Sequence, residues 1–138
     1  MTGKHLRVAC AIIERNGLVL ATRRSAAMSL PLKWEFPGGK IDHGETAEQC
    51  LLRELVEELS LRVVIRHPLP EHTHAYPDFS VTLYPFVCGM VGGEPVLHEH
   101  AALAWLPPGE LLTLDWAEAD LPVINGYLAR CGIMEARR

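Results

Sequence analysis

Three glutamates, Glu54, Glu57 and Glu58, stand at positions i, i+3 and i+4 of a segment with helical character, so they share one helix face. At about 100° per residue they span roughly 100° of arc, and aliphatic side chains fill a separate arc beside them. Like charges at these spacings repel each other, so a positive partner is expected there. Clustered oxygen ligands suit Mg²⁺ or Mn²⁺, which can also bind substrate phosphates. The spacing indicates phosphoryl chemistry, and its alternative is a solvated acidic helix face.

The elements around this segment are expected to hold the glutamates in place. Thr46 and Gln49 stand in capping-box register, and no glycine or proline follows before Leu61, which predicts a helix from Thr46 onward. The loop before it starts at Pro37-Gly38-Gly39, where two glycines relax the steric limits on the backbone. Upstream, residues 6–14 and 18–23 predict a hairpin closed by a tight turn at Asn16-Gly17, and residues 33–36 predict a short strand.

Strand patterns return after the helix, over residues 62–66, 80–91 and 101–106. Pro85 is expected at a sheet edge or a bulge, because it has no N–H to donate. A final helix is expected to begin near Asp120, with Pro122 in its first turn, and to end at Gly132. The order of elements predicts an α+β fold in which a mixed sheet lies between helices, as one domain over residues 1–138.

Composition narrows the possible partners. The 138 residues include 13 basic and 17 acidic side chains, for a formal charge of −4, which argues against binding to a nucleic acid polymer or an anionic membrane. No apolar run reaches the roughly 18 residues of a membrane span, so the chain is expected to be cytoplasmic. The four cysteines lack the paired spacing of a zinc site and are expected to be reduced and buried. The histidine pairs His72/His74 and His98/His100 are expected to be solvated.

Residues 39–61, GKIDHGETAEQCLLRELVEELSL, resemble the Nudix box, G-x5-E-x7-R-E-U-x-E-E-x-G-U with U aliphatic. The matching residues are Gly39, Glu45, Arg53, Glu54, Leu55, Glu57, Glu58 and Leu61. Ser60 replaces the last glycine of the pattern, which ends the helix in a left-handed conformation. This replacement is expected to cost on the order of 1 kcal/mol and removes no ligand.

The resemblance implies an α/β/α sandwich in which Glu54, Glu57 and Glu58 coordinate a divalent metal, Mg²⁺ or alternatively Mn²⁺. It also implies that the carbonyl of Gly38 contacts the metal, and that Glu45 supports the geometry of loop and helix. Arg53 is implied to orient a glutamate of the box. Because Arg53 and Glu57 are four residues apart, an ion pair between them can fix a carboxylate, although Arg53 can equally form a plain surface ion pair.

The rest of the chain resembles the MutT branch of this family in residues 21–24 (ATRR), 34–40 (WEFPGGK), 76–78 (YPD) and 119–124 (ADLPVI). That resemblance implies an enzyme that hydrolyses nucleoside triphosphates to monophosphate and pyrophosphate, by attack of water on the β-phosphorus, and so cleans the nucleotide pool. The expected partner is a small nucleotide, and the chain is expected to be a monomer or a homodimer. The alternatives are hydrolysis of ADP-ribose or a nucleotide sugar, and a non-catalytic nucleotide-binding module.

Several residues other than the matching residues of the box are candidates for substrate contacts. Arg23 can contact the base or ribose with its fork of donors, Phe36 can pack under the base, and Lys40 lies at the entry of the box; Arg23 and Phe36 can also be purely structural. Glu99 follows a short apolar run, where MutT-like enzymes carry a glutamate that binds metal or acts as the base. Its alternative is an exposed loop acid.

Asp120 matches the position where the enzyme that removes 8-oxo-dGTP carries an asparagine that reads the purine. An ionised aspartate can only accept hydrogen bonds, so it favours the amino group of cytosine, or N1–H and the amino group of guanine. Cytidine triphosphate pyrophosphohydrolases of this branch also carry aspartate there. The alternative is that Asp120 only caps the last helix.

Overall fold

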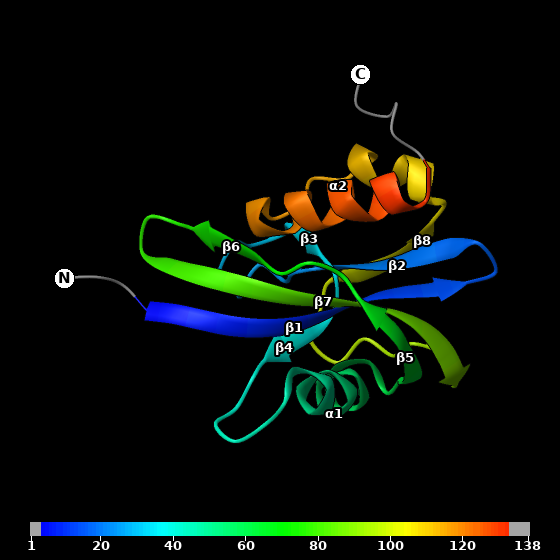
Figure 1. Cartoon of the computed structure of the whole chain (residues 1–138), viewed down its shortest axis with the longest axis horizontal. Coiled ribbons are helices and arrows are strands. Elements are labelled where there is room, and N and C mark those ends of the chain that lie inside the picture. Colours follow the sequence, from blue (N-terminus) through cyan, green and yellow to red (C-terminus); the bar gives the residue numbers. More distant parts are fainter. Residues whose placement is uncertain (1–3, 133–138) are drawn as a thin grey trace.

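The computed structural model describes residues 4–132, whose strands form one eight-stranded mixed sheet (Figure 1). The path β3-β2-β1-β7-β5 is extended by β8 beside β2, β4 beside β1 and β6 beside β7. The two longest strands, β1 and β7, run parallel at the centre. The strands are β1 (Lys4–Arg15), β2 (Leu18–Arg23), β3 (Trp34–Glu35), β4 (Gly38–Lys40), β5 (Arg62–Pro68), β6 (His72–Ala75), β7 (Phe79–Gly92) and β8 (Ala102–Leu106).

Helices cover both faces of the sheet, which confirms the predicted α+β sandwich. Helix α1 (Ala47–Leu59) lies against one face, and α2 (Leu121–Arg130) lies against the other with the short 3₁₀ helices η1 (Pro108–Thr113) and η2 (Glu118–Asp120) (Figure 1). Side chains of β1 alternate between two separate cores. Ala9, Ala11 and Ile13 pack on the α1 side, whereas Cys10 and Ile12 pack on the α2 side.

The predicted hairpin and the predicted box helix are both present. Asn16 and Gly17 have φ of 52° and 78°, as a tight turn between β1 and β2 requires. Thr46 caps α1, since its hydroxyl accepts from the Gln49 N–H at 3.0 Å and the Gln49 side chain accepts from the Thr46 N–H. Ser60 ends the helix in the left-handed conformation expected there, with φ of 55°.

Two short strands were not predicted, and Pro85 is not at an edge. Strands β4 and β6 contain glycine or histidine rather than the apolar alternation that marks a strand. Pro85 lies inside the sheet, paired with Cys10 of β1, so the prediction of an edge or a bulge is wrong. On the side of β7 away from β1, Pro85 lies between the part of β7 that pairs with β6 and the part that pairs with β5. No paired residue faces it there, so the missing N–H of the proline removes no hydrogen bond of the sheet.

The cysteines follow the prediction with one correction. Cys10, Cys50 and Cys88 are buried and free, but Cys131 is exposed because it follows the last turn of α2. None of the helices within residues 4–132 combines the length and the apolar character that a bilayer span requires.

Candidate functional site

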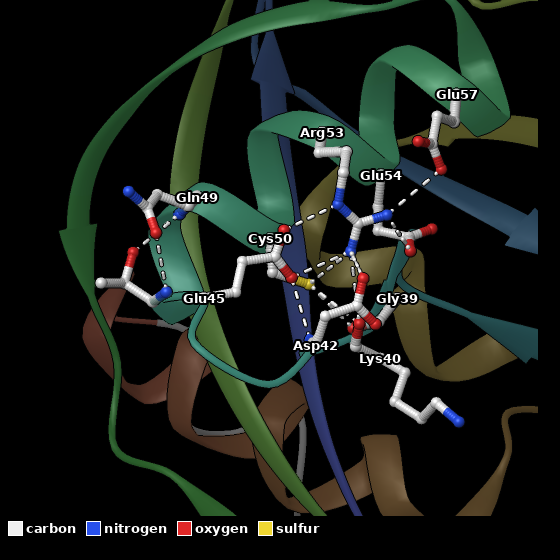
Figure 2. A network of polar contacts seen from close by, with 10 residues as sticks. Gly39, Lys40, Asp42, Glu45, Gln49, Cys50, Arg53, Glu54 and Glu57 are labelled. Carbon is white, nitrogen blue, oxygen red and sulfur yellow. Dashed lines mark hydrogen bonds and ion pairs between the residues drawn. The ribbon is translucent and has the colours of Figure 1, made fainter.

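Arg53 is the centre of an ion-pair network that joins the helix α1 to the loop before it (Figure 2). Its Nε and Nη2 donate to the two oxygens of Glu45, at 2.7 and 3.0 Å. Its Nη1 donates to Glu54 at 2.9 Å and to Glu57, one turn further along the helix, at 3.2 Å. A rigid guanidinium fork thus holds three carboxylates of the box in fixed positions.

Glu45 anchors the loop through the same network. The hydrogen bonds from Arg53, and a further one from the backbone N–H of Asp42 at 2.9 Å, lower the pKa of Glu45 to about 2. Glu45 is therefore ionised throughout the physiological range. Through these contacts Glu45 joins Arg53 of α1 to Asp42 of the loop before it.

Gly38 and Gly39 are required by close approach to neighbouring atoms. A Cβ on Gly38 would lie 1.9 Å from the carbonyl oxygen of Ala9 in β1. A Cβ on Gly39 would lie 2.1 Å from the carboxyl carbon of Glu54. Both separations are far below van der Waals contact, so only glycine lets the Glu54 carboxylate rest against the backbone of β4.

Glu58 lies on the same face of α1, at the wall of a cavity. Burial raises the pKa of Glu58 to about 7, and the charges of Glu54 and Glu35 add to the rise, whereas His100 opposes it. The neighbouring carboxylate charges disfavour the ionised form of Glu58 unless a positive charge compensates them. A strongly perturbed carboxyl in a cavity marks a candidate functional site.

These carboxylates fit the chemistry of a divalent cation. Within residues 4–132, no three His, Cys, Asp or Glu side chains already converge on one point that could hold a metal ion. The donor set is nevertheless that of a hard cation, since Glu54, Glu57 and Glu58 offer only carboxylate oxygens. A bound cation would also relieve the repulsion between Glu54 and Glu58. Glu54 reaches the backbone at Gly39, beside Gly38, whose carbonyl is the remaining predicted ligand of the box region.

A cavity of about 360 Å³ extends from Glu58 across the sheet face that carries α2. Gly38, Gly39, Lys40 and Glu58 line the end near α1. The rest of the lining is mainly apolar and includes Leu6, Val8, Phe36, Tyr76, Phe79, Val81, Leu83 and Ala119. An apolar cavity with a few polar groups is the usual form of a small-molecule site.

Asp120 lines this cavity and is 6% exposed. Its side chain makes no capping hydrogen bond to α2; instead, Oδ2 accepts from the backbone N–H of Phe36 at 3.0 Å. The capping alternative therefore does not describe this side chain. Burial raises the pKa of Asp120 to about 8, although the Phe36 hydrogen bond opposes the rise. At pH 7 the neutral acid predominates, and it can donate one hydrogen bond as well as accept.

Of the other predicted site residues outside α1, some line the cavity and others do not. Phe36 and Lys40 line the cavity, but Arg23 and Glu99 are not among the residues that line it. Arg23 donates from Nε to the carbonyl of Leu32 at 3.0 Å. Glu99 is exposed, in the loop between β7 and β8.

Among the polar residues of the cavity, Arg24, Glu35 and His100 were not predicted as site residues. The expectation that His100 is solvated is wrong, because only 3% of its side chain is exposed. For Arg24 the signal is the Arg-Arg pair at the end of a strand, but alternation alone does not say which arginine faces the substrate side. For His100 the only local signal is its place just before the apolar run of β8.

Comparisons with known proteins agree with this geometry. The NUDIX domain family matches residues 3–127. The CTP pyrophosphohydrolase of Escherichia coli K12 is 34% identical over 126 residues, which cover 91% of this chain and 93% of that protein. The 8-oxo-dGTP diphosphatase of the same strain is 35% identical over 122 residues, covering 88% and 95%.

Solved structures give the same result. A MutT protein of methicillin-resistant Staphylococcus aureus 252 superimposes with a TM-score of 0.74 at 36% identity, covering 97% of this chain and 98% of the other. A MutT protein of Methanosarcina mazei Go1 shares the fold, with a TM-score of 0.84 at 21% identity and coverage of 96% and 98%. With the box residues gathered around Arg53 and a family match over most of its length, the chain belongs to the NUDIX domain family.

Proposed function

We propose that this chain is a Mg²⁺-dependent pyrophosphohydrolase of nucleoside triphosphates that removes unwanted nucleotides from the pool. The observation that carries the proposal is one cavity whose lining combines Glu58, a carboxylate of the box, with Asp120 and a mainly apolar wall. This form suits a ligand with a polyanionic part and a flat aromatic part. The named activities of the Escherichia coli relatives, on CTP and on 8-oxo-dGTP, support the same substrate class.

At the phosphate end, Glu54, Glu57 and Glu58 would hold the metal together with the Gly38 carbonyl. Glu99 is a further proposed ligand or base, in a loop whose Val96 N–H and His98 ring contact Leu59 and Ser60 at the end of α1. A bound Mg²⁺ supplies charge shielding on phosphorus, an activated water and a stabilised leaving group. The residues of the chain do the rest: Arg53 fixes Glu54 and Glu57, and Lys40 offers an ammonium group to the phosphate oxygens.

At the base end, Phe36 provides an aromatic surface and Asp120 provides the polar contact. Because Asp120 is mostly protonated at pH 7, it can donate to a ring nitrogen or carbonyl oxygen of the base and accept from an amino or ring N–H. Cytosine, with N3 beside its amino group, and guanine, with O6 beside N1–H, both offer an acceptor next to a donor. A cytidine nucleotide and an oxidised guanine nucleotide are therefore the proposed substrates.

The test is pyrophosphate release in the presence of Mg²⁺ from CTP, dCTP, 5-methyl-dCTP, dGTP and 8-oxo-dGTP, compared by kcat/KM. ADP-ribose and a nucleotide sugar are included, with monophosphate formation as the readout. The proposal expects a triphosphate to lead the panel, with loss of turnover on chelation of Mg²⁺. If ADP-ribose or the sugar nucleotide leads, the proposed substrate class is wrong although the family assignment stands.

A further inference from the structure

His100 is a buried histidine with one ring nitrogen engaged and the other unpartnered. Its Nε2 lies 2.9 Å from Oε2 of Glu35, and its Nδ1 is buried with no hydrogen-bond partner. Since the Glu35 carboxylate only accepts, Nε2 must carry the hydrogen. An orphaned buried nitrogen costs free energy, so a histidine here needs a compensating role. The hydrogen bond to Glu35 supplies one.

Glu35 connects His100 to Arg24, because each of its two carboxylate oxygens binds one of them. Its other oxygen, Oε1, accepts from Arg24 Nη1 at 2.8 Å, and both side chains are 20% exposed. Arg24 is held from the opposite side by Ser29, whose carbonyl accepts from Nε at 2.6 Å and whose hydroxyl accepts from Nη2 at 3.0 Å. The guanidinium is thus fixed between β3 and the loop after β2.

Arg24 keeps donors free for a ligand. A guanidinium has five N–H donors, and these three contacts use one on Nε and one on each terminal nitrogen. One hydrogen on Nη1 and one on Nη2 therefore remain, and Arg24 lines the cavity. Two donors held in one fixed plane suit a ligand that offers several oxygens, such as a phosphate, better than a mobile lysine does.

The residues of this relay come from separate parts of the chain. Arg24 follows β2, Glu35 is in β3, and His100 precedes β8. The loop that holds Arg24 through Ser29 contains two left-handed residues other than glycine, Leu30 with φ of 48° and Leu32 with φ of 63°. Such backbone strain persists only where the surroundings fix the conformation. The relay and the strained loop together hold the Arg24 fork at the cavity wall.

We propose that His100 is a positioning residue: through Glu35 it orients the Arg24 guanidinium toward an oxygen pair of the bound nucleotide. This inference rests on the proposed function for the identity of the ligand. The contact acts on binding, because none of the three residues is among the carboxylates that Arg53 gathers in the box. Loss of the His100 hydrogen bond is therefore expected to raise KM and to leave kcat nearly unchanged.

A double-mutant cycle tests the relay, with the triphosphate that the wild type hydrolyses best as substrate. His100→Leu is expected to raise KM about tenfold, while kcat stays within about twofold. His100→Gln, which keeps an N–H donor for Glu35, is expected to restore most of the loss. In the Arg24→Ala background, His100→Leu is expected to add no further rise, because residues that act through one contact are not additive.

Two controls keep the test decisive. His67→Leu is the matched control, since His67 also has a buried Nδ1 without a partner but does not line the cavity; its KM is expected to stay at the wild-type value. If His100→Leu fails to fold, Glu35→Gln, which has the same shape and lacks the charge, is expected to give the same non-additive rise in KM with Arg24→Ala.

An additive cycle, or an unchanged KM in Arg24→Ala, overturns the positioning role while pyrophosphate release by the wild type still supports the proposed function. Absence of release from every triphosphate overturns the proposed function instead. In that case the cycle is run on the diphosphate substrate that is hydrolysed, and the same additivity decides the relay.

Discussion

Replacing Asp120 by asparagine is expected to remove a large pH dependence of stability. Burial raises the pKa of Asp120 from 3.8 to about 8, so folding favours the neutral acid. The contribution of Asp120 to the free energy of unfolding is fully present below pH 3.8 and is lost as the pH rises toward 8. Between these two pH values, each pH unit lowers the free energy of unfolding by about 1.4 kcal/mol. The loss at pH 7 is therefore on the order of 4 kcal/mol. Because the side chain is 6% exposed, solvent screening reduces this figure little.

Asparagine keeps the shape of the site and cannot ionise. Its amide oxygen can accept from the Phe36 N–H, as Oδ2 of Asp120 does at 3.0 Å. Asp120→Asn is therefore expected to be close to the wild type in stability near pH 4 and increasingly more stable toward pH 8. Its advantage should grow by about 1.4 kcal/mol per pH unit. Because Asp120 is mostly neutral at pH 7, the variant is also expected to retain binding of the nucleotide base.

The assay is urea denaturation of both proteins at intervals between pH 5 and pH 8 without divalent metal. Asp115→Asn is the matched control, because Asp115 is an exposed carboxylate that pairs with Lys33 at the surface; its free-energy difference from the wild type is expected to lack this slope. Parallel stability curves for the wild type and Asp120→Asn would falsify the assignment of a buried neutral acid at position 120.

Three further outcomes follow from the box. Glu57→Gln is expected to lower kcat/KM on the order of 100-fold, because it removes the charge of a proposed metal ligand. Thermal stability is expected to stay unchanged, because Glu57 is exposed. Wild-type turnover of the variant at saturating Mg²⁺ would mean that this helix face does not bind the metal. Gly39→Ala, which places a Cβ 2.1 Å from the Glu54 carboxyl carbon, is expected to weaken Mg²⁺ binding measured by calorimetry, whereas an unchanged affinity contradicts the close approach. Ser60→Gly is expected to raise the free energy of unfolding by up to about 1 kcal/mol at unchanged kcat/KM, because φ at this position is 55°; a loss of stability speaks against strain at the helix end.

The sequence was informative where one local rule decides the conformation. Asn16-Gly17 specifies its turn, and the Thr46 and Gln49 pair specifies the start of α1, because in each case the interacting atoms are within four residues. The carboxylate face of α1 follows from helical periodicity in the same way. These elements carry the box, so the helix face that presents Glu54, Glu57 and Glu58 could be predicted before any tertiary contact was known.

The cavity depends on contacts between distant residues, which local patterns do not contain. His100 and Glu35 are 65 positions apart, and Asp120 and Phe36 are 84 apart. The ionisation of Asp120 likewise depends on burial, which no local pattern reports. Strand β4 forms because Gly38 lets its backbone approach β1 closely, which strand propensity does not describe. The sequence therefore predicts the chemistry of the box better than the contacts that select the substrate.

The sheet divides the interior into two cores that share no residue, one beneath α1 and one beneath α2. The box helix rests on the first, whereas the apolar walls around Asp120 belong mostly to the second. Substitutions in the core beneath α2 are therefore separated by the strands from the buried face of α1, and their effects on the free energy of unfolding should combine nearly additively with changes in that face. This separation gives evolution a simple route to new preferences: one half of the protein can drift in sequence and select a different nucleotide while the hydrolytic half stays under constant selection.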